Sequence, residues 1–352
     1  MSKVTYIKAM RHFLIFFLFC LLGAPCAISQ ATQPTTPPKP HEIEITFQNG
    51  GITLAGTLLL PDSSGPVPAI VLTHGSGPTT REEGRPFAER FVRLGMAALI
   101  FDKRGCGQSK GMWYDASLDD LADDAIAAAA FLTSRADVDS KKIGIWGVSQ
   151  AGWVNLRAIT RAPGVFAFAV FVTGGAVKPL DGERYDYGAA LDRINATPEE
   201  RREAMALVTG YFEYLRTGEG RDELKSAIKA AATKRWGTAA DFSQVLPTVA
   251  TRSKWEWVPT YDPEHDIVLL KIPVLVVLGN LDRPGLAEVA EERWRTFLAK
   301  AENPDATLLV FVPAGHGATT GTHHHYVDGP NTYAPGYFEM VDSWLRVHCA
   351  LR

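Results

Sequence analysis

Ser149 stands in the sequence I-G-I-W-G-V-S-Q-A-G-W, which covers residues 143–153. Small residues such as Gly147 and Gly152 let a strand and a helix approach closely, as a sharp strand-to-helix turn requires. The helix that follows directs unpaired N–H groups and the positive end of its dipole toward the serine. Negative charge that develops beside Ser149 would therefore be stabilised, as nucleophilic attack on a carbonyl requires.

Two further polar residues follow buried apolar runs. Asp282 closes the sequence G-N-L-D after the run at residues 272–278, and His316 lies in P-A-G-H-G after the run at residues 306–312. If these runs are parallel strands, their carboxyl ends meet at one edge of the sheet, where open α/β sheets bind ligands. The 34 positions between the two residues leave room for one helix and one strand.

These residue types fit the roles of a catalytic triad. Ser149 is a weak nucleophile and needs a base near neutral pH, which His316 supplies. Asp282 would hold the histidine tautomer and stabilise the imidazolium. The sequence therefore predicts Ser149, His316 and Asp282 as catalytic residues, with Asp262 or Asp266 as alternatives for the orienting acid.

The chain resembles the α/β-hydrolase superfamily between residues 43 and 344, in the serine turn, in the order Ser-Asp-His and in the motif D-x-R-G-x-G-x-S at residues 102–109. Ala151 occupies the last glycine position of G-x-S-x-G, and alanine is small enough for this turn. The resemblance implies a serine hydrolase, of the esterase or serine-aminopeptidase kind, with a helical cap.

The resemblance also implies two oxyanion-hole donors, the backbone N–H groups of Ser76 and Gln150. Ser76 lies in the sequence H-G-S-G-P, a glycine-rich turn in which amides can face a cleft without side-chain obstruction. His74, which opens this turn, is expected to be a hydrogen-bonded structural residue. Asp102 and Arg104 are expected to form an internal ion pair that braces the loops.

The order of elements predicts an α/β fold, and the resemblance implies a mostly parallel eight-stranded sheet with helices on both faces. Residues 42–176 and 267–352 form the predicted core. Residues 177–266 are rich in charge and lack buried-strand runs, which indicates a helical cap inserted into the core. Within it, T-P-E-E at residues 197–200 is a helix start with a capping-box glutamate.

Residues 1–29 are predicted to be a secretory signal peptide that takes no part in the fold. Three basic residues precede a ten-residue apolar run at 13–22, which is too short to span a bilayer, and small residues follow. Cleavage after Ser29 and cleavage after Ala31 both fit. The predicted location is secreted or periplasmic, and the membrane is a partner only transiently, through this segment.

Residues 30–41 are rich in Pro and Thr and are predicted to be an extended linker. Two alternatives to cleavage are a lipoprotein site at Cys26, which Pro25 directly before it disfavours, and an uncleaved membrane anchor.

Two cysteines, Cys106 and Cys349, remain after cleavage. They are predicted to be unpaired thiols, because nothing in their spacing demands a disulfide.

Composition excludes several kinds of partner. The net charge of -3 becomes -6 when the three basic residues of the signal segment leave, and no basic stripe is visible, so no nucleic acid is expected. No dinucleotide fingerprint or phosphate loop with lysine is present, and no cofactor is predicted. The three adjacent histidines 323–325 cannot all face one ion, so an exposed loop is expected there and no metal is predicted.

The predicted reaction is hydrolysis of a small carboxylic ester through an acyl-enzyme intermediate. A peptidase of the serine aminopeptidase type acting on a short peptide is the first alternative, and a thioesterase the second. Coenzyme A thioesters do not fit export from the cytoplasm. An alternative from another class is a catalytically silent binding protein, since this scaffold hosts unrelated functions.

Overall fold

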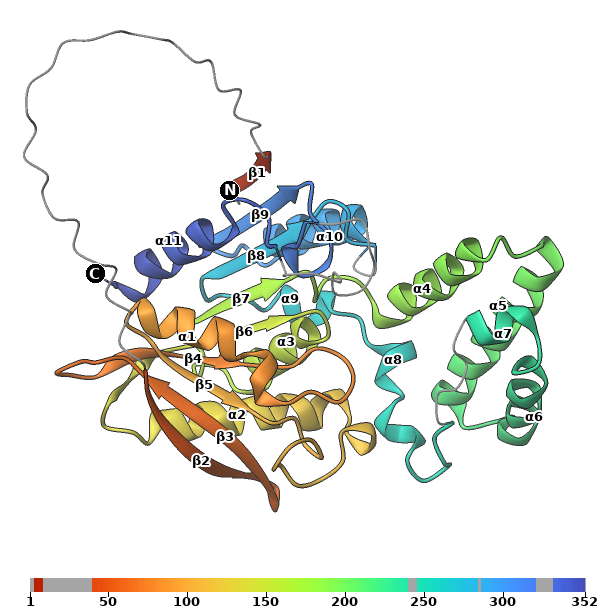
Figure 1. Ribbon diagram of the computed structural model, residues 1–352, viewed down its shortest axis with the longest axis horizontal. Coiled ribbons are helices and arrows are strands. Elements are labelled where there is room, and N and C mark those ends of the chain that lie inside the picture. Colours follow the sequence, from red (N-terminus) through yellow and green to blue (C-terminus); the bar gives the residue numbers. More distant parts are fainter. Residues whose placement is uncertain (1–2, 9–39, 240–245, 284–285, 321–331, 352) are drawn as a thin grey trace, which may run out of the picture.

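The computed structural model describes residues 3–8, 40–239, 246–283, 286–320 and 332–351. Within these residues one nine-stranded sheet has the order β1-β9-β8-β7-β6-β4-β5-β3-β2, and helices cover both of its faces (Figure 1). The strands are β1 (Lys3–Lys8), β2 (His41–Asn49), β3 (Ile52–Leu60), β4 (Val67–Leu72), β5 (Ala97–Phe101), β6 (Val138–Val148), β7 (Phe168–Val172), β8 (Val274–Gly279) and β9 (Ala306–Val312).

The central strands are apolar along their whole length because both faces of the sheet are covered. Strands β4 to β9 pair in parallel, whereas β3 pairs antiparallel with both β2 and β5. The β2–β3 hairpin turns through Gly50 and Gly51, with φ of 53° and 86°, which a two-residue turn with this twist requires. The mostly parallel α/β-hydrolase sheet predicted from the sequence is confirmed.

Two hydrophobic layers hold the helices on the sheet. One layer packs beneath three helices and the other beneath two, so the sheet lies in the middle of a three-layer core. The first layer carries α2 (Leu118–Thr133), α3 (Ala151–Arg161) and α10 (Ala287–Lys300), and the second carries α1 (Arg85–Arg93) and α11 (Tyr337–Cys349). Helix α2 begins at a capping box, in which the Ser117 hydroxyl accepts from Asp120 N.

A helical segment with its own core separates β7 from β8. Its members are α4 (Pro179–Arg193), α5 (Pro198–Thr217), α6 (Arg221–Ala231), α7 (Arg235–Ala239) and α8 (Trp257–Thr260). Helix α5 starts at the predicted capping box of Thr197 and stops at Gly218, which has a φ of 82°. In Figure 1 the segment lies on the side of the molecule toward which the arrows of β6 and β7 point.

Strand β1 lies within the segment predicted to be a signal peptide. Its backbone pairs in parallel with β9, from Lys3 beside Thr307 to Lys8 beside Val312, so this part of the segment does join the sheet. The apolar run at 13–22 and most of the linker lie outside the described residues. If residues 1–29 are removed, the sheet retains strands β2 to β9, the eight that were predicted. None of the described helices is long and apolar enough to cross a membrane.

The expected ion pair between Asp102 and Arg104 is wrong, because the two side chains have different partners. Asp102 accepts from Arg81 Nε at 3.2 Å and from Arg81 Nη2 at 2.9 Å. Arg104 donates from Nε and Nη2 to the two carboxylate oxygens of Asp124, both at 2.7 Å. All four side chains are buried, at 3 to 7% exposure. Arg81 and Asp124 come from the 3₁₀ turn η1 (Arg81–Glu83) and from α2, so the motif ties three elements together.

We expect Asp102→Asn to lower the free energy of unfolding by about 3–5 kcal/mol, because it removes the buried counter-charge of Arg81 and leaves only Glu44, whose side chain is 68% exposed. Urea denaturation followed by circular dichroism measures this change. Asp137→Asn is the matched control: its partner Arg135 is close, but the Asp137 side chain is 42% exposed. The control is expected to cost at most about 1 kcal/mol, and equal losses in the two variants would contradict the prediction.

Candidate active site

Ser149 occupies a left-handed backbone position between β6 and α3, with a φ of 63°. A non-glycine residue persists in this region only where its surroundings hold it. Here Ser149 N donates to Val172 O at 3.0 Å, and Gly152 N donates to Ser149 O at 2.8 Å. These two bonds fix the end of β6 to β7 and the start of α3 to the turn at Ser149.

The small residues around Ser149 have the predicted role. A Cβ atom at Gly147 would lie 2.3 Å from the Cβ of Ala151, so a larger residue at 147 would push the helix away from the strand. A Cβ atom at Gly152 would lie 2.5 Å from the backbone nitrogen of Gly175, in the segment after β7. The sequence around Ser149 therefore builds the sharp strand-to-helix turn that was predicted.

Asp282 and His316 form a hydrogen-bonded pair. Asp282 follows β8, and His316 opens the 3₁₀ turn η4 (His316–Ala318) after β9. The Nδ1 atom of His316 lies 2.9 Å from Oδ1 of Asp282, whose side chain is only 2% exposed. Burial alone would lower the pKa of His316, but the hydrogen bond and the charge of Asp282 outweigh it and raise the pKa above its ordinary value. A base held in one tautomer with a carboxylate behind it is the arrangement that a serine nucleophile needs.

The two alternative acids have other partners. Asp262 accepts from Arg293 Nη2 at 2.9 Å and pairs with Lys178 at 2.6 Å. Asp266 accepts from the hydroxyl of Tyr261 at 2.7 Å, and also from the side chains of Thr160 and Arg157. Asp282 is thus the one of the three carboxylates that contacts His316.

The loops that carry Ser149 and His316 meet at the end of β7. Val172 accepts the hydrogen bond from Ser149 N at 3.0 Å, and the hydroxyl of the next residue, Thr173, accepts from Gly317 N at 2.9 Å. Because β6, β7, β8 and β9 run parallel, all three predicted catalytic residues leave the sheet at its carboxyl edge. Thr173 was not identified from the sequence, since a threonine after a strand carries no distinctive signal.

The predicted oxyanion donors flank the same turn. Gln150 directly precedes α3, and the loop of Ser76 lies against the turn, since a Cβ at Gly75 would be 3.6 Å from Val148 O. Within the described ranges, neither the Ser76 nor the Gln150 amide donates a hydrogen bond to another protein group. The arrangement can therefore direct two amides toward an atom bound beside Ser149.

His74 and Lys103 lie directly behind this loop. The Nε2 atom of His74 donates to Phe101 O at 2.5 Å, and burial together with the charge of Lys103 lowers its pKa to about 4. His74 is therefore neutral and structural, as expected. Lys103 donates to Gly75 O, Gly77 O and the Gln150 side chain, and was missed in the sequence. The only signal for it is a basic residue inside the motif D-K-R-G.

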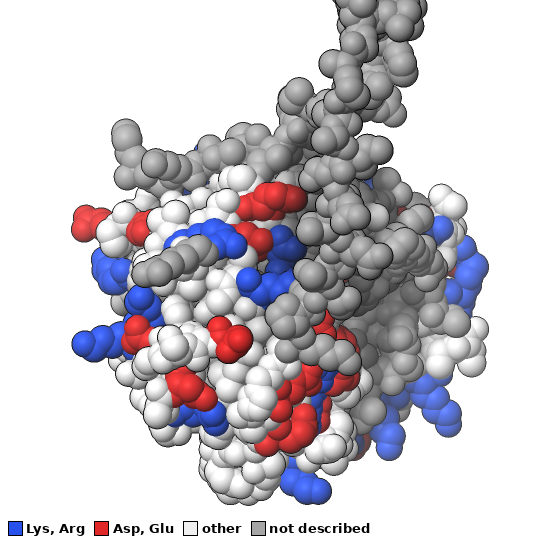
Figure 2. Space-filling view, turned by 60° about the vertical axis from the view of Figure 1, so that its left-hand side comes forward, with Lys and Arg blue, Asp and Glu red and all other residues white. Residues whose placement is uncertain are grey.

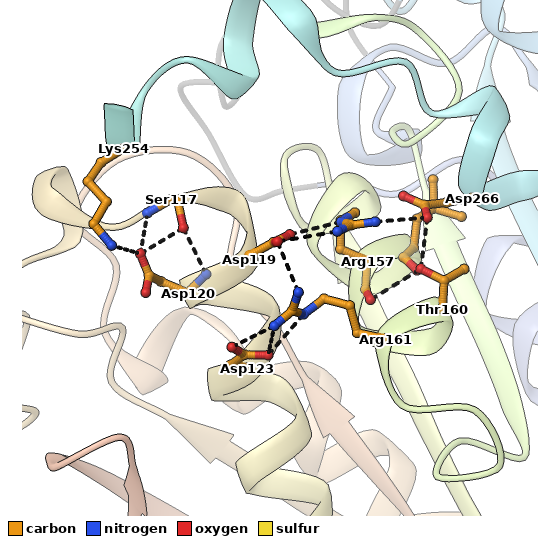
Figure 3. A network of polar contacts seen from close by, with 10 residues as sticks. Ser117, Asp119, Asp120, Asp123, Arg157, Thr160, Arg161, Lys254 and Asp266 are labelled. Carbon is orange, nitrogen blue, oxygen red and sulfur yellow. Dashed lines mark hydrogen bonds and ion pairs between the residues drawn. The ribbon is translucent and has the colours of Figure 1, made fainter. Parts of the chain in front are cut away.

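A charged network links the core to the helical segment beside the site (Figure 3). Arg157 of α3 bonds to Asp119 at 2.9 Å and to Asp266 at 3.2 Å, which joins α2 to the short helix α9 (Glu264–Ile267). Lys254 of the 3₁₀ turn η3 (Arg252–Lys254) reaches Asp120 at 2.6 Å, close to the start of α2. These pairs connect the start of α2 to the end of the inserted segment.

No group of metal-ligating side chains exists among the described residues. The three histidines 323–325 lie outside them. Cys106 and Cys349 are both buried and free, as predicted.

Figure 2 shows acidic and basic side chains interspersed over one face of the molecule, where neither sign forms a continuous band.

Comparison with known proteins identifies relatives. A family model described as X-Pro dipeptidyl-peptidase (S15 family) matches residues 50–318. The quorum-quenching protein AidA of Acinetobacter baumannii is 33% identical over 111 residues, which are 31% of this chain and 36% of AidA. Thiohydrolase aneE of Aspergillus aculeatus is 36% identical over 110 residues, which are 31% of this chain and 34% of aneE. The match thus spans about a third of the length of each of these curated relatives.

Solved structures share the fold. An esterase of Pyrococcus furiosus superposes with a TM-score of 0.56 at 17% identity, over 91% of this chain and 100% of its own. An acylaminoacyl peptidase of Pyrococcus horikoshii superposes with a TM-score of 0.56 at 14% identity, over 88% of this chain and 42% of its own. At these identities the likeness establishes the α/β-hydrolase fold.

We expect Asp282→Asn to lower the pKa of His316, because the substitution removes the charge that raises it and leaves the burial that lowers it. Titration of the imidazole protons by NMR measures this shift, with a His316→Gln spectrum to assign the signal. Asp262→Asn is the control, and the pKa of His316 is expected to be unchanged in this variant. An unchanged His316 titration in Asp282→Asn would contradict the assignment of the orienting acid.

Proposed function

Because the chain belongs to the X-Pro dipeptidyl-peptidase (S15) family, and because Asp282 and His316 form a buried pair at the edge where Ser149 turns, we propose that it hydrolyses its substrate by a Ser149-His316-Asp282 triad. The observation that carries the proposal is the 2.9 Å hydrogen bond between His316 Nδ1 and Asp282. It leaves Nε2 of His316 as the nitrogen that can accept a proton from a serine hydroxyl.

The reaction proceeds in two halves. Ser149 Oγ attacks the carbonyl carbon while His316 Nε2 takes the hydroxyl proton, and the N–H groups of Ser76 and Gln150 bind the oxyanion. His316 then returns the proton to the leaving group, and an acyl-serine remains. Water, deprotonated by His316, attacks this ester, and the acid departs as Ser149 regains its proton.

The first substrate class that we propose is a small carboxylic ester. The curated relative named as a thiohydrolase supports a hydrolytic reaction. An alkoxide is a better leaving group than an amine anion, so an ester places the smaller demand on His316 as the acid. The signal peptide predicted at residues 1–29 is the basis for proposing a secreted or periplasmic location, where coenzyme A thioesters are not available.

The second candidate is a peptidase that acts on a short peptide with a free amino terminus. The family description favours it, and so does a carboxylate on α4. Burial lowers the pKa of His316, and Asp282 raises it. The negative charge of Asp186 on α4 raises this pKa further. A negative charge whose field reaches the base would attract the ammonium group of a peptide.

Ser149→Ala is expected to keep its fold and its thermal midpoint while kcat falls on the order of a millionfold, because the nucleophile is gone. Turnover of p-nitrophenyl acetate and mass spectrometry after fluorophosphonate treatment test this together. The wild-type protein should gain one adduct on Ser149, and Ser149→Ala none. A folded wild-type protein without an adduct would favour a catalytically silent binding protein.

Parallel assays on short p-nitrophenyl esters and on aminoacyl p-nitroanilides distinguish the two substrate classes. The ester proposal expects kcat/KM to be higher for the esters, and Asp186→Asn to change ester turnover little. If the chain is a peptidase instead, nitroanilide turnover dominates and Asp186→Asn raises the KM for substrates with a free ammonium group. N-acetylated nitroanilides provide the matched control, since they carry no positive charge for Asp186 to attract.

A further inference from the structure

Lys103 is a buried lysine whose side chain contacts three neutral oxygen atoms. Only 3% of its surface is exposed. Its Nζ atom donates to Gly75 O at 2.9 Å, to Gly77 O at 3.0 Å and to Oε1 of Gln150 at 3.1 Å. The two carbonyls lie on either side of Ser76, and Gln150 carries the second predicted donor. One ammonium group therefore connects both halves of the predicted oxyanion hole.

The bond to Gly75 fixes the direction of the Ser76 amide. The carbonyl of residue 75 and the N–H of residue 76 belong to one planar trans peptide group and point in opposite directions. When Lys103 holds Gly75 O toward the interior, the Ser76 N–H must point away from the interior. The ammonium charge also polarises this peptide group, which strengthens the hydrogen bond that its N–H can donate.

The bond to the Gln150 side chain ties the loop of Ser76 to the start of α3. The spacing between the two amides depends on how this loop sits against the helix, because the loop follows β4 and the helix follows β6. Catalytic hydrogen-bond donors must be held to about half an ångström to be effective. A single cation that bonds to both sides provides this constraint.

Burying the Lys103 ammonium lowers the stability of the fold, which argues that this residue has a role other than stability. Among the described residues no carboxylate lies within ion-pair distance of Lys103, in contrast to Arg81 and Arg104 nearby. A buried charge without a counter-ion costs several kcal/mol. A methionine of similar volume would avoid that cost, so the ammonium contributes something that an apolar side chain cannot.

We propose that Lys103 is the positioning residue of the oxyanion hole, whose ammonium holds the amides of Ser76 and Gln150 in place for the transition state. The inference rests on the proposed function. Lys103 itself does not touch the substrate; it acts through the two loops. Its loss should therefore weaken binding of the oxyanion more than binding of the ground-state substrate.

Lys103→Met is expected to lower kcat for p-nitrophenyl acetate about a hundredfold, the size of one lost oxyanion donor, with KM changed less than about threefold. The matched control is Arg104→Met, which removes the next cation of the same loop and leaves Asp124 unpaired. That variant is expected to be less stable than Lys103→Met and yet to retain the kcat of the wild type in its folded fraction. The proposal would be overturned if kcat fell in both variants in proportion to their loss of stability.

The pH profile gives a readout that a purely structural brace would not change. Burial lowers the pKa of Lys103 to about 8, although Cys106, Glu83 of η1 and Asp124 of α2 oppose the shift. Because the protonated form holds the loops, kcat of the wild type should decline as pH rises through about 8. Lys103→Arg, which stays charged, should recover part of kcat and lose this decline. A wild-type profile that stays level to pH 10 would count against the proposal even if Lys103→Met fails to fold.

These outcomes separate the inference from the proposed function. If the wild-type protein is neither labelled by a fluorophosphonate nor active on esters or nitroanilides, the proposed function and the role of Lys103 are both overturned. If Ser149→Ala abolishes turnover while Lys103→Met retains kcat, the triad stands and the role of Lys103 alone is overturned.

Discussion

The left-handed backbone at Ser149 is the constraint on which the rest of the site depends. A φ of 63° at a serine is unfavourable, and it persists because the turn is bonded to β7 on one side and to α3 on the other. That geometry is possible only where the strand and the helix nearly touch, which excludes a side chain at Gly147. The same strained turn raises the hydroxyl above the sheet and aims the start of α3 at it, so position and electrostatics have one cause.

The parallel sheet turns this local feature into a site. Parallel strands release their following loops at one edge, so residues 149, 282 and 316 all follow strands at that edge although 167 positions separate the first from the last. Two hydrogen bonds at the end of β7 then hold the loops of Ser149 and His316 in register. The sheet brings the loops to the same edge, and these bonds fix their relative positions.

The features predictable from the sequence are those encoded over short distances. The turn at Ser149, the capping boxes at Ser117 and Thr197 and the strand-end positions of Asp282 and His316 each follow from a few adjacent residues. The missed features depend on contacts between distant segments. Arg81 as the partner of Asp102 is one example, and the edge strand Lys3–Lys8 is another, since its pairing with β9 leaves no local pattern.

The consecutive residues Asp102, Lys103 and Arg104 show how buried charge can be divided between stability and function. Each is at most 5% exposed, and each faces a different element. The outer two are paired with opposite charges, so the loop is anchored to η1 and to α2 at a moderate net cost. Between them, the ammonium of Lys103 bonds to the carbonyls on either side of Ser76. The ion pairs stabilise the loop, and that gain in stability offsets part of the cost of burying Lys103 without a counter-ion. Lys103, whose charge costs the most free energy to bury of the three, is therefore the residue that contacts both predicted oxyanion loops.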